Sequence, residues 1–158
     1  RGAMLHQFPT KAQLMVAVVE ASLEADYAAY LAATRGMKDP LERMLAIADT
    51  AWAQFRKPSG IAQFEIWNAT RSDAELAAVV LPVHDAMYAR TLDDHIRHFE
   101  EAGATDGTDI RALFHHNVAL LRGLALEHLL GTPLSALEPA VGLMKRTIVA
   151  IVGQREGQ

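Results

Sequence analysis

Seven histidines are the side chains of this sequence best suited to bind a metal ion or to move a proton. His95 and His98 are three residues apart, a spacing at which two imidazoles on one helix face can share a metal. His115 and His116 are adjacent and therefore point to different faces of a helix. The Glu-x-x-His pattern of di-iron helical bundles is absent from the sequence. The neighbours of His95 and His98 are acidic and indicate a solvated surface: Asp93, Asp94, Glu100 and Glu101.

Other catalytic chemistry finds little support in the residue types. The sequence has no cysteine, which excludes disulfides, zinc–thiolate sites and thiol nucleophiles. No glycine-rich phosphate loop and no spacing typical of a Ser/His/Asp triad stands out. We therefore predict a protein that is not an enzyme and carries no cofactor or metal. A helical metalloenzyme stays open as the weakest alternative.

Aromatic and polar side chains on otherwise apolar helical faces form a second group. Ligand sites are mostly apolar with a few placed polar groups. Plain core is the competing interpretation for each residue, and it is favoured for the large aromatics taken singly. Glu65, beside two of the aromatics, would suit a cationic aromatic ligand, but a solvated face explains it better. The predicted ligand-binding residues are Trp52, Phe55, Phe64, Trp67, Asn68, His84, Met87, Tyr88, Thr91, Asn117 and Leu121.

The elements that must position these side chains are helices, because apolar residues recur with helical periodicity between capping residues. Thr10 and Gln13 form a capping box that opens a helix to about Thr34. Asp39-Pro40 opens the next helix, and Pro58-Ser59-Gly60 is expected to stop it. The predicted helices span about 1–7, 10–34, 39–57, 61–70, 72–102, 109–130 and 135–152.

Two further capping boxes and one internal proline shape the second half of this layout. Ser72 and Glu75 are expected to open the longest helix, and Ser135 and Glu138 the last one. Pro82 lies within the longest helix, where it removes one backbone hydrogen bond and is expected to kink the helix. No convincing alternating strand and no repeat of fixed period is present. The fold class is therefore all-α.

Charge is distributed unevenly along the 158 residues. The net charge is −4, which by itself argues against binding nucleic acid. Residues 1–11 contain two basic and no acidic residues, so the remainder carries −6. A short basic end on an acidic body fits a DNA-facing tip on a domain that does not contact DNA.

The first eleven residues carry the most specific pattern. Gly2-Ala3, Leu5-His6-Gln7, Phe8-Pro9-Thr10-Lys11 and Leu14 resemble the end of the helix-turn-helix of TetR-family transcriptional regulators. The resemblance implies that the chain begins within the recognition helix, that residues 1–11 end a DNA-binding domain, and that residues 12–158 form a helical effector-binding and dimerisation domain. Leu5 departs from the family, which usually has tyrosine there, so a backbone contact to DNA is lost.

The resemblance also assigns DNA contacts within this segment. Arg1 suits guanine and Gln7 suits adenine, whereas Lys11 and the backbone N–H groups behind Thr10 suit phosphates. Two helices that precede the recognition helix in the family are absent from this sequence, so operator DNA is a partner expected only of a longer protein. The predicted DNA-binding residues are Arg1, Gly2, Ala3, Leu5, His6, Gln7, Thr10 and Lys11.

The last two helices are expected to pair with a second copy in a four-helix bundle, as the family implies. The helix 109–130 is apolar on two sides and must bury both. The final helix carries apolar residues spaced four-three-four-three, which suits a bundle seam, although burial within one subunit is the alternative. The predicted interface residues are Ala119, Gly123, Leu126, Leu130, Val141, Met144, Ile148 and Ile151.

The resulting prediction is a cytoplasmic, homodimeric, TetR-like repressor that a small, largely apolar effector releases from its operator. The effector would shift the dimer between two spacings of its recognition helices through the helix 10–34. A helical small-molecule-binding or scaffold protein without DNA binding is the main alternative. No apolar run is long enough to cross a membrane, and no signal peptide is recognised at the given start.

Overall fold

The computed structural model describes residues 8, 10–104 and 109–153, and within these ranges the chain forms six helices and no strand. The helices are α2 (Lys11–Thr34), α3 (Pro40–Phe55), α4 (Pro58–Ala69), α5 (Ala74–Glu101), α6 (Ile110–Leu129) and α7 (Leu134–Gly153). The predicted all-α class is confirmed. None of the described helices is both long and apolar enough to span a bilayer. The predicted first helix, residues 1–7, lies outside the described residues.

Side-chain caps fix where most of these helices begin. The Thr10 hydroxyl accepts a hydrogen bond from the backbone of Gln13, whose side chain accepts one from the backbone of Thr10, so the predicted capping box is confirmed. Asp39 and Asp109 cap α3 and α6 in the same manner, by accepting from backbone N–H groups of the first turn. Each cap satisfies a donor that the helix itself cannot.

Two of the predicted caps are wrong by one or two residues. Asp73, not Ser72, caps α5, because its carboxylate accepts from the backbone of Leu76. A carboxylate at this position also interacts favourably with the positive end of the helix dipole. The last helix begins at Leu134, so Ser135 lies in its first turn rather than at the cap. For α5, the sequence offers two adjacent candidate caps, Ser72 and Asp73.

The segment Pro58-Ser59-Gly60, expected to end α3, instead forms the first turn of α4. Proline is well suited to a first helical position because its missing N–H would have no partner there. Gly60 is buried, and a Cβ atom on it would lie 2.5 Å from the carbonyl oxygen of Gln54. This contact explains the glycine: the start of α4 packs directly against the end of α3.

The helices enclose two apolar clusters. The larger cluster joins α3, α5, α6 and α7 and includes the fully buried Phe99 together with Trp52, Leu121 and Met144. The smaller cluster joins α2, α4 and the start of α5 through Val19, Ile66, Leu76 and Val80. Gln63, 1% exposed, ties α4 to α2 by donating a 2.6 Å hydrogen bond to the Ser22 hydroxyl.

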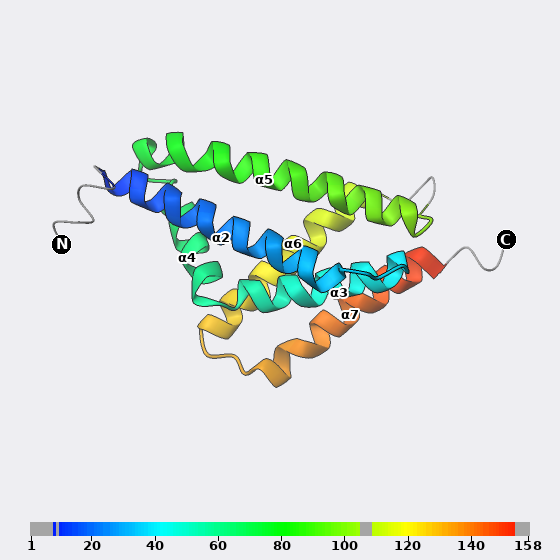
Figure 1. The fold of residues 1–158 in the computed structure, drawn as a ribbon. Helices are drawn as coiled ribbons and strands as arrows, with labels where there is room; N and C mark the ends of the chain where they lie inside the picture. Colours follow the sequence, from blue (N-terminus) through cyan, green and yellow to red (C-terminus); the bar gives the residue numbers. More distant parts are fainter. Residues whose placement is uncertain (1–7, 9, 105–108, 154–158) are drawn as a thin grey trace.

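In space, α2 and α5 run side by side along one side of the molecule, and α3 and α7 lie on the other (Figure 1). α6 crosses behind them, and the start of α2 and the end of α7 lie at opposite ends. α5 continues as one helix through Pro82, which removes the bond to the Ala78 carbonyl without ending the helix. The packing of the helices leaves a cavity between α2, α3, α5 and α6.

Candidate ligand-binding cavity

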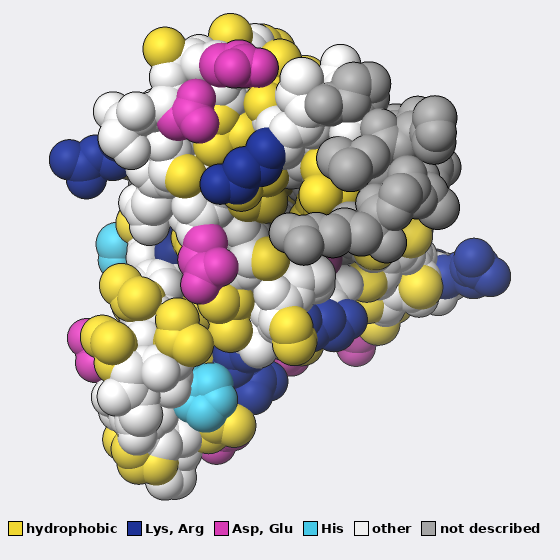
Figure 2. All heavy atoms as spheres, turned by 90° about the vertical axis from the view of Figure 1, so that its left-hand side faces the viewer, with side chains coloured by type: hydrophobic (Ala, Val, Ile, Leu, Met, Phe, Trp, Pro, Cys, Tyr) yellow, Lys and Arg dark blue, Asp and Glu magenta, His cyan; other side chains and the backbone are white. Residues whose placement is uncertain are grey.

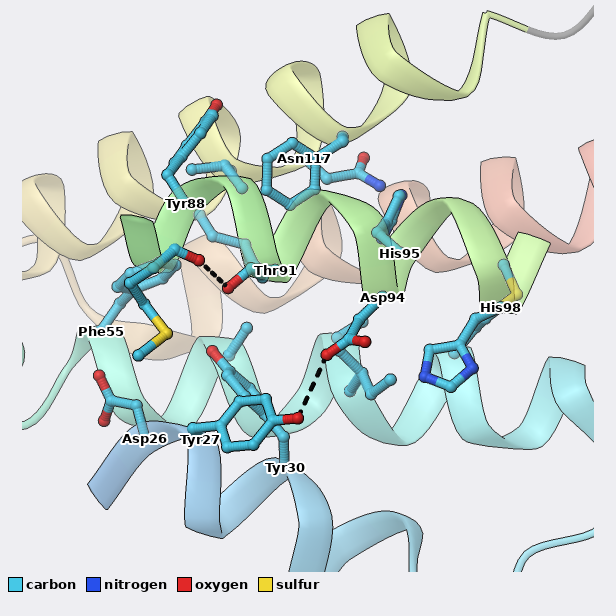
Figure 3. Close-up of a pocket in the computed structure, with 18 of the residues that line it drawn as sticks. Asp26, Tyr27, Tyr30, Phe55, Tyr88, Thr91, Asp94, His95, His98 and Asn117 are labelled. Carbon is cyan, nitrogen blue, oxygen red and sulfur yellow. Dashed lines mark hydrogen bonds between the residues drawn. The ribbon is translucent and has the colours of Figure 1, made fainter. Parts of the chain in front are cut away.

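A cavity of about 330 Å³ lies at the centre of the helices. α2, α3, α5 and α6 supply most of its wall, α4 contributes Gln63 and Trp67, and α7 contributes Met144 and Ile148. Figure 3 shows side chains from α2 on one side of the space, and side chains from α5 and α6 on the other. The volume lies within the range of small-molecule sites, and apolar surface dominates the wall.

The structure brings most of the predicted ligand-binding residues to this wall. Those that line the cavity are Phe55, Trp67, His84, Met87, Tyr88, Thr91, Asn117 and Leu121. Their role as ligand contacts stays a prediction. Among them, Asn117 is the most buried polar group, and the hydroxyl of Thr91 donates to the backbone carbonyl of Met87 (Figure 3).

Three predicted ligand contacts lie elsewhere. Trp52 is buried in the larger cluster, under the guanidinium of Arg56. Phe64 packs between Phe55 and Trp67 without lining the cavity. Asn68 is exposed, because it follows Trp67 around the helix by a full 100°. Glu65 is exposed too and outside the wall, so it offers nothing to a cationic ligand in this cavity.

An aromatic row connects three helices, α4, α5 and α6, along the cavity. Trp67 packs edge-on against His84, which stacks on Tyr88, and Tyr88 meets Phe114 edge-on, with ring centroids 5.0–5.5 Å apart. These are favourable geometries for aromatic pairs. The Tyr88 hydroxyl shares a 2.6 Å hydrogen bond with Nδ1 of His115, an exposed residue of α6. The row gives the cavity a continuous aromatic side.

α2 supplies polar side chains to the wall that the sequence did not single out: Asp26, Tyr27 and Tyr30 (Figure 3). Gln63 donates a 3.2 Å hydrogen bond to the Asp26 carboxylate. Burial raises the pKa of Asp26, opposed by that hydrogen bond and by the charge of Lys57. Burial also raises the pKa of Tyr30, with Asp26 acting in the same direction and Arg122 in the opposite one. Tyr30 is therefore near enough to both charges to sense each of them.

At one end of the cavity, which we call the paired end, arginine side chains form ion pairs with carboxylates. Arg43 of α3 forms an ion pair with Glu101 of α5, and Arg97 pairs with Asp94 at 2.6 Å. The hydroxyl of Tyr27 donates to the same Asp94 at 3.4 Å (Figure 3). These contacts hold α2 and α3 against the last turns of α5.

His95 corrects the expectation that this stretch of α5 is a solvated surface. It lies in the cavity wall between Phe99 and Phe114, with ring centroids 4.6 and 5.2 Å away. Burial lowers the pKa of His95 to about 4, helped by the charge of His98. The imidazole is therefore neutral near pH 7. Within the described residues, no three His, Asp or Glu side chains gather as a metal would require.

Arg122 of α6 dominates the opposite end, which we call the aromatic end. Its guanidinium lies 4.8 Å from the ring centroid of Trp67 and 5.8–5.9 Å from those of Phe55 and Phe64. Among the described residues it has no ion pair and no hydrogen bond, and its Nε atom is buried. Burial lowers the pKa of Arg122, opposed by Tyr88 and Tyr30. A guanidinium nevertheless stays charged near pH 7.

One signal in the sequence could have identified Arg122. It is the single charged residue in the apolar run from Val118 to Leu126, so a helix buried on two sides must place it against other protein. The signal for α2 was weaker. Asp26 and Tyr30 lie one turn apart in the alanine-rich second half of α2, and nothing local indicates which way that face turns.

The predicted DNA-binding residues fall mostly beyond what the structure describes. Arg1, Gly2, Ala3, Leu5, His6 and Gln7 lie outside the described residues. Thr10 and Lys11 are described: both are exposed, and Thr10 is engaged as the cap of α2.

The predicted interface residues divide into two sets. On α6, Ala119, Gly123, Leu126 and Leu130 are exposed, with Leu126 at 54% and Leu130 at 73%. On α7, Val141, Met144 and Ile148 are buried in the core of the same chain, and Ile151 packs against that core. The apolar seam of α7 faces α3 and α6, which leaves Val141, Met144 and Ile148 little surface for a second subunit, and the interface role of these α7 residues stays a prediction.

α7 has a second face that is free. Ala136, Leu143 and Ala150 are exposed at intervals of seven residues, and Leu143 is 59% exposed. Hydrophobic side chains gather on the lower part of Figure 2, which corresponds to the corner where α6 ends and α7 begins. The two helices thus carry neighbouring apolar surface that no other described residue covers.

Comparisons with known proteins add no relative: no family model matches the chain, and neither a curated protein nor a solved structure shows significant similarity to it. The resemblance to the TetR family therefore rests on the sequence pattern from Gly2 to Leu14 alone.

Proposed function

We propose that this chain is the effector-binding and dimerisation part of a TetR-like transcriptional regulator, a repressor that a small molecule releases from its operator. The observation that carries this proposal is the position of α2. Its second half supplies Asp26, Tyr27 and Tyr30 to the cavity wall, and its first residue follows the segment that resembles a recognition helix. One rigid element therefore reaches both the cavity and the proposed DNA-facing end.

A ligand in the cavity would act on α2 through direct contact. The hydrogen bonds from Gln63 to Ser22 and Asp26 tie α2 to α4, and the bond from Tyr27 to Asp94 ties it to α5. A ligand that bonds better to one arrangement of these groups shifts the population toward it. The coupling works in both directions, so DNA would alter ligand affinity by the same factor.

A homodimer completes the proposal, and the exposed faces of α6 and α7 support it. Ala119, Gly123, Leu126 and Leu130 follow a four-three-four spacing on α6, the periodicity of a helix-bundle seam. Small residues such as Gly123 permit close helix approach, and a Cβ added there would meet nothing within 4 Å in this subunit. A two-fold dimer would suit a palindromic operator.

The regulator is tested with the encoded protein extended upstream of Arg1. It is used to select binding sites from random double-stranded DNA, and the selected sites are footprinted. The proposal expects a two-fold symmetric site, and expects that substituting Gln7→Ala weakens binding. Selection of no site, or an upstream region without two helices, would overturn the DNA-binding part. The cavity would then belong to a helical ligand-binding protein that does not act on DNA.

The dimer is tested on the 158-residue chain by sedimentation equilibrium. The double variant Leu126→Glu, Leu143→Glu places four carboxylates in the proposed interface of the dimer and should yield monomers. Leu81→Glu is the matched control, because Leu81 is also exposed, at 41%, but lies on α5. A monomeric wild-type chain, or a dimer unaffected by the double variant, contradicts this interface.

A further inference from the structure

Arg122 is the one cationic side chain of the cavity wall that meets no acceptor among the described residues. Arg43 and Arg97 also line the cavity, but each forms an ion pair with a carboxylate of the paired end. A buried charge without a partner is costly, so proteins pair buried charges or hold them for a ligand. Arg122 has this exceptional position inside a cavity of ligand size.

The packing around Arg122 leaves its hydrogen-bonding edge for a ligand. Trp67, Phe55 and Phe64 lie around the guanidinium carbon at distances typical of cation–π contacts. Such contacts engage the flat face of the group, whereas its N–H donors point outward in its plane. That fork matches the two oxygens of a carboxylate.

A neighbouring donor points to the same ligand chemistry. The indole Nε1 of Trp67 is buried and has no hydrogen-bond acceptor within the part of the chain that the structure describes. An indole N–H can only donate. Two cavity residues in contact, Trp67 and Arg122, therefore both require an acceptor. A ligand group with several acceptor oxygens would supply it, and an amine would not.

The rest of the wall determines what the acceptor group is attached to. Phe114, Val118, Leu121 and Met144 present apolar surface, and the row from Trp67 to Tyr88 offers flat aromatic faces. Asp26 carries the opposite charge in the same wall, which disfavours a ligand group with two negative charges. A single negative charge on an apolar, aromatic body fits both conditions.

We propose that the cavity binds an apolar aromatic carboxylic acid, whose carboxylate is held by Arg122 at the aromatic end while its body lies along the α5–α6 wall. This proposal rests on the cavity being the effector site of the proposed regulator. It concerns binding alone, so it can be tested without DNA.

The test uses matched acids and primary amides: 4-phenylbutyrate, 1-naphthylacetate and indole-3-butyrate with their amides, titrated calorimetrically into the 158-residue chain near pH 7.5. A charge-assisted hydrogen bond predicts that an acid binds about 10- to 100-fold more tightly than its amide. Equal affinity within each pair, or no binding of any acid at millimolar concentration, would overturn the proposal. This measurement needs no variant and so does not depend on any variant folding.

Variants then locate the carboxylate. Arg122→Met should reduce the acid-to-amide preference to near one, and Arg122→Lys should retain part of it. Arg111→Met is the matched control, because Arg111 lies on the same helix but is exposed outside the cavity wall. A preference that survives in Arg122→Met would overturn the assignment. A purely structural role of Arg122 would weaken acid and amide alike.

The two proposals fail separately. Acids that bind with the expected preference but leave DNA binding unchanged would contradict the regulatory function and leave the ligand class standing. Release from DNA by a neutral or cationic molecule, together with equal acid and amide affinities, would contradict the ligand class and leave the regulator standing.

Discussion

The two ends of the cavity hold arginines in opposite electrostatic situations. At the paired end, Arg43 meets Glu101 in an ion pair between α3 and α5, and Arg97 meets Asp94 within α5. At the aromatic end, Arg122 is stacked among rings and meets no carboxylate among the described residues. The difference teaches that a charge in a cavity wall indicates a ligand only where the protein does not already neutralise it.

The largest expected effect is a loss of stability on truncating Phe99, which lines the cavity near the paired end. Phe99 is fully buried, so Phe99→Ala should lower the free energy of unfolding by about 3–5 kcal/mol and enlarge the cavity. Urea denaturation followed by circular dichroism measures it. Because the change is remote from Trp67, the acid-to-amide preference should persist in the variant. A loss below about 1 kcal/mol would contradict the packing described here.

A substitution at Gly60 is expected to disturb the aromatic end of the cavity. Gly60→Ala places a Cβ atom 2.5 Å from a backbone carbonyl of α3, so α4 must shift relative to α3, which we expect to disturb the contact between Trp67 and Arg122. We expect a loss of up to about 3 kcal/mol and weaker binding of the acids. Gly142→Ala is the control, because its Cβ would make only a 3.5 Å contact with the Arg146 side chain. Equal stability of the two variants would contradict the close helix approach.

His95, between the two ends, predicts how stability depends on pH. Its pKa is about 4 in the folded chain and near 6.5 when unfolded, so the unfolded state binds more protons between these values. The stabilising effect of the neutral imidazole is complete above pH 6.5 and is lost as pH falls toward 4. The loss from this group is about 2 kcal/mol at pH 5.

The measurement compares unfolding free energies at pH 7 and pH 5 for the wild type and for His95→Gln. The variant should lose less stability over this interval than the wild type. His116→Gln, which alters an exposed histidine of α6, is the control. An identical pH dependence in all three proteins would contradict the buried, neutral state of His95.

The smallest expected effect tests whether the paired end is merely structural. Arg97 is more than half exposed, so Arg97→Met should cost no more than about 1 kcal/mol. The acid-to-amide preference should stay at its wild-type value, in contrast to Arg122→Met. Calorimetric titration of both variants with the same acid and amide decides this. A drop in the acid-to-amide preference for Arg97→Met would place the ligand carboxylate at the paired end and contradict its assignment to Arg122.

The fold was predictable wherever its causes are local. Thr10 with Gln13 and Asp39 with Pro40 determine helix starts by contacts within one turn, and both were predicted from sequence. Pro58 was misinterpreted because the same residue type can follow a helix or open one. Only the packing of Gly60 against Gln54, a contact between two helices, selects the second possibility.

The cavity was predictable in part, for a related reason. Aromatic and polar residues at helical spacing on α5 indicated one wall, and His84, Tyr88 and Thr91 do line it. Periodicity does not reveal how far each helix is rotated about its axis, so Asp26 and Tyr30 of α2 were missed. The same uncertainty explains why the apolar seam of α7, which packs inside the chain, was predicted to face a second subunit.

In the proposed regulation, the length of α2 determines how far Lys11 moves when the helix turns about its cavity end. From Tyr30 at the cavity to Lys11 at its first residue, the helix extends about 28 Å at roughly 1.5 Å per residue. If α2 turns as a rigid rod about its cavity end by about 6°, Lys11 moves by about 3 Å. That displacement is close to the spacing of about 3.4 Å between successive base pairs. A small turn of α2 at its cavity end would thus become, by leverage, a displacement on the scale of one base pair at its other end.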